Sequence, residues 1–283
     1  MKKTFQYESF DIQYSDIGEG LPVILLHGFG EDSRIWNHQA EHLSSHCRLI
    51  IPDLPASGAS LPLKQGNDSI LKGLPASIDS LAEAIYALTK HENLASFILL
   101  GHSMGGYISL AIAEKYGDHL MGLGLIHSTA FADNEDKKNT RRKAIDFIQK
   151  NGGYNFLQTA IPGLFGQAFN EKQPNIVNSL IEQFNPANAK KDVVDAALIA
   201  YYSAMLNRPD RTIVLKSSKV PVLFIIGTED KAVPMADTLQ QVSLPETSYV
   251  HILQQTGHMG MLEAPALVNE HLMNFINNIK HST

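Results

Sequence analysis

A run of apolar residues that ends in Gly-x-Ser-x-Gly is the feature that most constrains how this chain can fold. Residues 97–100 are typical of a buried strand, and residues 107–113 have the composition of a helix. Between them, Gly101 and Gly105 flank Ser103 and lack the side chains that would collide in a tight turn. A strand, a sharp turn and a helix in this order would hold the Ser103 hydroxyl clear of a sheet.

Two further apolar runs are followed by residues that can activate a serine. Residues 220–226 are typical of a buried strand, and Asp230 comes shortly after them. Residues 248–253 indicate another strand, and His258 follows in a loop before the last helix. A serine hydroxyl needs a base within hydrogen-bond reach, and that base needs an orienting partner. In this chain His258 could be the base for Ser103, and Asp230 could be the partner that orients it.

A fourth apolar run, residues 22–26, is followed by His27-Gly28-Phe29-Gly30, a turn that can direct a backbone N–H at a reacting carbonyl. Strands that alternate with helices predict a doubly wound, mostly parallel sheet. Ligands of such sheets bind beyond the carboxyl ends of the strands. The serine, the acid, the histidine and the glycine-rich turn all follow strands, so we expect them to converge.

The pattern of elements predicts one α/β domain with an insertion. Residues 5–14 predict a hairpin, and residues 78–91 have the spacing of an amphipathic helix. Between residues 131 and 217 the strand pattern stops, and helical stretches occur, the clearest at 141–150 and 192–206. We therefore expect a core domain at residues 1–130 and 218–283, and a helical cap at 131–217 inserted after the sixth strand.

Size and composition narrow the class of protein. At 283 residues, the chain is long enough for one large domain with an insertion. The net charge of −6 and the lack of a basic tract argue against a nucleic-acid partner. No apolar run is long enough to span a membrane, and none follows the N-terminal lysines as in a signal peptide. Cys47 is the only cysteine, so an internal disulfide is impossible. Together, these features lead us to expect a cytoplasmic protein without a membrane partner.

With these four motifs in the expected order, the chain resembles the α/β-hydrolase superfamily over nearly its whole length. The resemblance implies the α/β-hydrolase fold. It also implies that Ser103 is the nucleophile, Asp230 the acid and His258 the base. The backbone N–H groups of Phe29 and Met104 would form the oxyanion hole. No metal or organic cofactor is required for this chemistry.

The resemblance further implies a serine hydrolase with a small-molecule, ester-like substrate. We expect cleavage of a small or medium, mostly apolar carboxylic ester through an acyl-serine intermediate. Related members that displace halide or open epoxides carry aspartate at the position of Ser103, so those activities are excluded. Thioesters and lactones stay open, as does haloperoxidase-like activity without a cofactor. Two broader alternatives are hydrolysis of a carbon–carbon bond next to a ketone and a non-catalytic ligand receptor on the same scaffold.

Other residues near the motifs have competing interpretations. His102, His127 and Trp36 are predicted to line the substrate pocket, and each is also compatible with a structural role. Asp230 is compatible with a helix N-cap, in which case the neighbouring Glu229 is the alternative acid.

Three histidines recur every four residues at His38, His42 and His46, so a helix would place them on one face. Such spacing suits a metal, but no glutamate follows the first histidine as in the zinc-protease pattern. We therefore expect a solvated helix face and predict no metal site.

Overall fold

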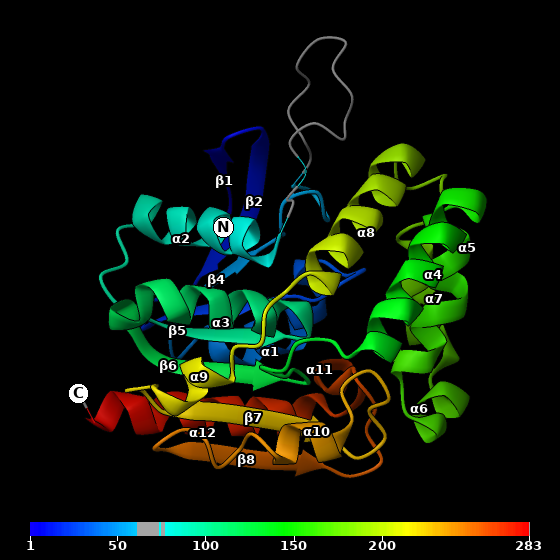
Figure 1. Ribbon diagram of the computed structural model, residues 1–283. Helices are drawn as coiled ribbons and strands as arrows, with labels where there is room; N and C mark the ends of the chain where they lie inside the picture. The colour runs from blue at the N-terminus through cyan, green and yellow to red at the C-terminus, as the bar shows by residue number, and fades with distance from the viewer. Residues whose placement is uncertain (61–73, 75–76, 283) are drawn as a thin grey trace.

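The computed structural model describes residues 1–60, 74 and 77–282, and these residues form an eight-stranded sheet (Figure 1). The strands are β1 (Lys2–Tyr7), β2 (Phe10–Ile17), β3 (Pro22–Leu26), β4 (Arg48–Pro52), β5 (Phe97–His102), β6 (Leu120–Ile126), β7 (Val222–Gly227) and β8 (Ser248–Leu253). Their order is β1-β2-β4-β3-β5-β6-β7-β8. β2 pairs antiparallel with both β1 and β4, and from β4 to β8 the neighbouring strands are parallel.

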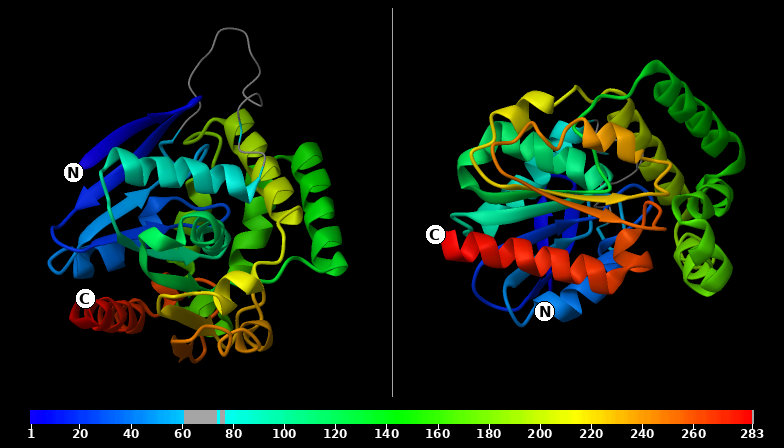
Figure 2. Two further views of the ribbon diagram at one scale, coloured as in Figure 1. Left: turned by 60° about the vertical axis from the view of Figure 1, so that its left-hand side comes forward. Right: turned by 90° about the horizontal axis from the view of Figure 1, so that it is seen from below.

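Helices cover both faces of the central strands, which explains the continuous apolar runs of the sequence. In β3, Val23 and Leu25 belong to one buried cluster, and Ile24 and Leu26 belong to the cluster on the opposite face. Figure 2 shows the two helical layers on either side of the sheet. One layer contains α1 (Asn37–Leu43) and α12 (Pro265–Ser282), and the other contains α2 (Ile78–His91) and α3 (Met104–Tyr116).

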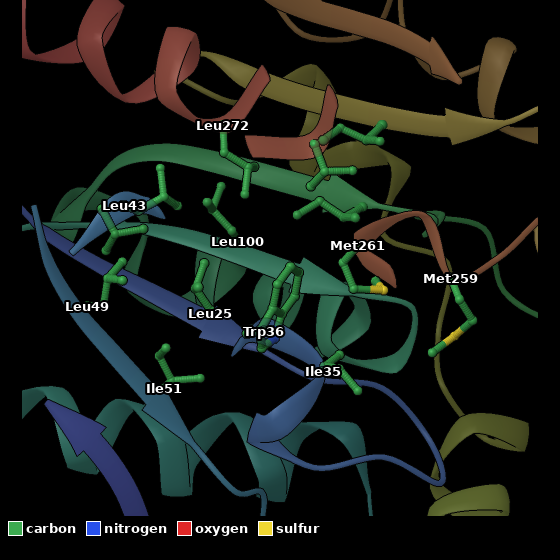
Figure 3. Close-up of a cluster of buried hydrophobic side chains, with 14 of the residues drawn as sticks. Leu25, Ile35, Trp36, Leu43, Leu49, Ile51, Leu100, Met259, Met261 and Leu272 are labelled. Atoms are coloured by element: carbon green, nitrogen blue, oxygen red, sulfur yellow. The ribbon is translucent and has the colours of Figure 1, made fainter. Parts of the chain in front are cut away.

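Figure 3 shows the core between the sheet and the layer of α1 and α12. Trp36, at the end of the 3-10 helix η1 (Ser33–Trp36), is fully buried there. It belongs to the same cluster as Leu25 and Leu100 of the sheet and Met261 of the short helix α11 (Gly260–Glu263). The core therefore reaches the carboxyl ends of β3 and β5, directly beneath the turns that follow these strands.

Between β6 and β7 the chain leaves the sheet and forms helices that lie together to one side of it, except for the last one, which packs on α3 (Figure 1). Helix α4 packs on α5 and α8, and α5 also packs on α8. The elements of this insertion are α4 (Glu135–Asn151), α5 (Gly153–Ala160), η3 (Ile161–Leu164), α6 (Gln167–Lys172), α7 (Pro174–Glu182), α8 (Lys191–Leu206) and α9 (Thr212–Lys216). The remaining short helices are η2 (Gly117–His119) and α10 (Met235–Leu239).

Most of the predicted elements are confirmed. The opening hairpin is β1 and β2, the helix predicted at 78–91 is α2, and those predicted at 141–150 and 192–206 lie within α4 and α8. The helix expected to carry three histidines is shorter than predicted. Helix α1 ends at Leu43, and the N–H groups of His46 and Cys47 both donate to Leu43 O in the turn that leads into β4. His38, His42 and His46 are nevertheless all exposed, as expected. In the described part of the chain, every helix is too short or too polar to cross a membrane.

Candidate active site

Ser103 lies at the sharp turn between β5 and α3, as the sequence predicts. Its backbone has φ 50° and ψ −115°, a strained conformation for a residue with a side chain. Glycine is needed beside it, since a Cβ at Gly105 would lie 2.6 Å from Leu26 O and 2.7 Å from His27 O. The Ser103 N–H donates to Ile126 O at 3.0 Å, which ties the turn to β6. The Ser103 side chain stands at the carboxyl end of the sheet and stays partly exposed.

The loop after β3 lies against Ser103. A Cβ built at Gly28 would stand 3.0 Å from Ser103 Cβ, so the absence of a side chain allows this close approach. The Gly28 N–H donates to Glu31 Oε2 at 2.7 Å, which fixes the loop. Phe29 follows Gly28, and Met104 is the first residue of α3, whose first-turn N–H groups have no carbonyl partner within the helix. The two predicted oxyanion-hole residues therefore belong to segments that meet at Ser103.

Asp230 and His258 are 28 residues apart in sequence but share a hydrogen bond. His258 Nδ1 lies 2.8 Å from Asp230 Oδ2. The other carboxylate oxygen, Oδ1, accepts from the N–H groups of Ala232 and Val233 at 2.9 and 2.8 Å, so the carboxylate is held on both sides. Burial opposes its charge, but the adjacent His258 and His127 rings outweigh burial and hold the pKa of Asp230 well below its ordinary value.

His258 sits in a loop that is held mainly by backbone hydrogen bonds. The His258 N–H donates to Leu164 O at 2.6 Å, which joins this loop to the end of η3 in the insertion. The Glu263 carboxylate accepts from the N–H groups of Gly166, Gly257 and Met259 at 2.8, 3.0 and 3.0 Å. Burial works against a charged imidazole, but the Asp230 carboxylate outweighs it and raises the pKa of His258 above its ordinary value.

Two of the predicted pocket residues lie beneath the site. His102 is fully buried, with Nδ1 2.9 Å from Glu31 Oε2 and Nε2 2.9 Å from His258 O. It therefore connects the loop after β3 to the backbone of His258. Trp36 is also fully buried and meets the His102 ring edge-on, with ring centroids 6.5 Å apart. Substrate contact by His102 and Trp36 stays a prediction, while their packing beneath the site is a structural fact.

The third predicted pocket residue, His127, also contacts Asp230. Its Nδ1 is 3.2 Å from Asp230 Oδ2, the same oxygen that faces His258. Among the described residues, His127, Asp230 and His258 form the one group whose ligand atoms, all within 4.8 Å of one another, are close enough for a metal. Hydrogen bonds from the two imidazole rings to one carboxylate oxygen account for this proximity without a metal.

Several residues that shape the site were not expected from the sequence. Glu31 and Glu263 fix the loops around Ser103 and His258, and Ser128 Oγ donates to Ser103 O at 2.7 Å. The sequence features that could have pointed to Glu31 and Glu263 are weak. Glu31 directly follows the glycine-rich turn, and Glu263 lies five positions after His258. Neither position shows in sequence that the carboxylate binds backbone N–H groups.

Comparisons with known proteins agree with the fold. A family model described as the alpha/beta hydrolase fold matches residues 22–265. The chain is 29% identical over 263 residues to the dihydrolipoyllysine-residue acetyltransferase component of an acetoin cleaving system from Pseudomonas putida, covering 91% of this chain but only 64% of that protein. It is 24% identical over 261 residues to an (E)-2-((N-methylformamido)methylene)succinate hydrolase from Acinetobacter baylyi, covering 91% of this chain and 90% of that protein.

Among solved structures, a thermophilic esterase from Thermogutta terrifontis superposes with a TM-score of 0.84 and 26% identity, covering 99% of both chains. The family match spans most of the chain, including the turn at Ser103, the loop after β3, and both Asp230 and His258. This chain belongs to the α/β-hydrolase family.

Proposed function

We propose that this chain is a serine hydrolase that cleaves a small or medium, mostly apolar carboxylic ester. The observation that carries the proposal is the hydrogen bond between Asp230 and His258 at the end of the sheet where Ser103 occupies a strained turn. The similarity to the Thermogutta terrifontis esterase, over 99% of both chains, supports an ester as substrate. The site lies at the carboxyl ends of the strands, where doubly wound sheets bind their ligands.

In the proposed mechanism, His258 is the base. Its Nδ1–H donates to Asp230, which leaves Nε2 with the lone pair that takes the Ser103 proton. Ser103 Oγ attacks the ester carbonyl, and the N–H groups of Phe29 and Met104 stabilise the oxyanion. His258 then gives its proton to the departing alcohol. Water, deprotonated by the same histidine, releases the acid from the acyl-serine.

Residues 131–217 would act as a cap over this site. Tyr202 of α8 stacks on the Phe29 ring with centroids 4.1 Å apart, and Phe156 of α5 meets both rings edge-on at 6.4 and 5.7 Å. A cavity of about 320 Å³ lies between the loop after β3 and α8, and its lining includes Leu198 together with the charged residues Arg34 and Lys190. The rings of Phe156 and Tyr202 against Phe29, beside the proposed oxyanion hole, favour an apolar substrate.

A p-nitrophenyl ester series from acetate to decanoate, hydrolysed by wild type and by Ser103→Ala, tests the proposal. Turnover that peaks at one chain length and disappears in Ser103→Ala is the expected result. Turnover that persists in Ser103→Ala would overturn it. A wild-type protein that reacts with a fluorophosphonate at Ser103 but hydrolyses no ester would point to a carbon–carbon bond. A protein that does neither would point to a non-catalytic receptor.

A further inference from the structure

The proposed triad does not use His127, although this residue is built into the site. It directly follows β6, and its φ of 48° is in the left-handed region, where residues other than glycine are uncommon. Its N–H donates to Ile225 O at 2.8 Å, which fixes the backbone against β7. Strained backbone of this kind persists when the surrounding structure holds it, and it is concentrated at functional sites.

The environment of the His127 ring leaves it one polar contact. Nδ1 lies 3.2 Å from Asp230 Oδ2, whereas Nε2 is buried and has no hydrogen-bond partner within the described residues. A Cβ at Gly260 would overlap Nε2, so the ring is wedged against the backbone that follows His258. An ionised carboxylate only accepts hydrogen bonds, so the proton of the neutral ring is on Nδ1. The ring thus faces the site as a hydrogen-bond donor.

Burial keeps this donor uncharged. Desolvation lowers the pKa of His127 to about 4, despite the opposing effect of Asp230. A neutral ring supplies a hydrogen bond without a second positive charge, which would disfavour the imidazolium that forms on His258 during catalysis. The other titratable groups that face the two rings are His102, beside both, and Glu31 and Glu263, near His258.

We propose that His127 is a positioning residue whose Nδ1–H donates a second hydrogen bond to Asp230 Oδ2, and that this bond orients the carboxylate and moderates the basicity of His258. The inference rests on the proposed function. With both backbone donors on Oδ1 and both imidazole rings on Oδ2, the carboxylate receives four N–H groups. Without the His127 bond, more negative charge stays on the oxygen that faces His258, so the pKa of His258 rises.

His127→Leu and His127→Asn separate this role from simple packing. Leucine fills the space without a donor. Asparagine keeps an N–H near the position of Nδ1 and tolerates the left-handed backbone. In His127→Leu we expect kcat to fall about 10- to 100-fold with KM little changed, since a hydrogen bond to a charged group is lost. The acid limb of the kcat/KM profile should move to higher pH, and His127→Asn should restore both.

A purely structural role would lower stability or kcat without moving the acid limb, and an unmoved limb in folded His127→Leu would overturn the inference. If His127→Leu does not fold, ¹⁵N NMR spectra of histidine-labelled wild type test the inference through the tautomer of the His127 ring. The His127 signals are assigned by their absence from the spectrum of His127→Asn. The neutral Nδ1–H form of His127 across the neutral pH range is expected, and an Nε2–H or doubly protonated ring would overturn it. Activity that persists in Ser103→Ala would instead show that the proposed function fails.

Discussion

Asp230→Asn should remove most of the activity while leaving the site nearly unchanged in shape. Asp230 Oδ1 accepts two backbone N–H groups, so the asparagine carbonyl oxygen would take that position. Its NH₂ group would then face Nδ1 of both His258 and His127, where a carboxylate oxygen now accepts at 2.8 and 3.2 Å. Two donors cannot face each other, so His258 would present its Nδ1 lone pair and bind its proton on Nε2. In that tautomer the imidazole cannot take the proton of Ser103.

The size of the effect follows from the loss of the base. Replacing the acid of such a triad by its amide lowers kcat by about 10⁴-fold, or about 5 kcal/mol in activation free energy. The assay is the steady-state hydrolysis of the preferred p-nitrophenyl ester, with thermal unfolding measured in parallel to show that the variant is folded. We expect most of the loss in kcat, because substrate binding does not depend on the histidine tautomer.

Glu229→Gln is the matched control, since this neighbouring acid was the alternative. Glu229 Oε2 accepts an exposed hydrogen bond from the Gln167 N–H at 2.9 Å and so serves the surface of the insertion. Glu229→Gln should keep nearly wild-type kcat. A folded Asp230→Asn variant that loses less than about tenfold, or a Glu229→Gln variant that loses as much as Asp230→Asn, would refute the assignment of the acid.

Three further expectations concern pH and packing. Because Asp230 raises the pKa of His258 above 6.5 and the base must be neutral, kcat/KM should rise with pH through a midpoint above that value, and a lower midpoint would contradict this. Gly105→Ala should lower the free energy of unfolding, measured by urea unfolding, by about 3 kcal/mol, because the added Cβ would collide with backbone atoms. Gly163→Ala is the control: its added Cβ would stand in open space, so its free energy of unfolding should change little. Glu263→Gln should lower the free energy of unfolding by about 1–3 kcal/mol in the same assay. Backbone N–H groups donate to both carboxylate oxygens of Glu263, and the substitution replaces one of these oxygens by an NH₂ group. An unchanged urea midpoint would contradict this prediction.

The sequence contained enough information for the fold and for the order of the site residues. Alternation of apolar strands and amphipathic helices is a local property, so α2 and the opening hairpin could be placed from the residues alone. The turn at Ser103 could also be predicted from the sequence, because the glycines that the turn requires for steric reasons flank Ser103 closely in sequence. The carboxyl ends of parallel strands meet at one edge of the sheet, which is why four motifs far apart in sequence could be expected to converge.

Only the tertiary structure decided how the polar groups around these motifs are paired. His127 was expected at the pocket, yet its hydrogen bond goes to Asp230, 103 residues away. His102 likewise connects Glu31 to the backbone of His258, and no spacing in the sequence relates these three positions. Hydrogen bonds depend on distances of a few tenths of an ångström and on the direction of each donor. Those quantities are set by the packing of strands and loops from the whole chain, whereas strand and turn patterns are set by the residues themselves.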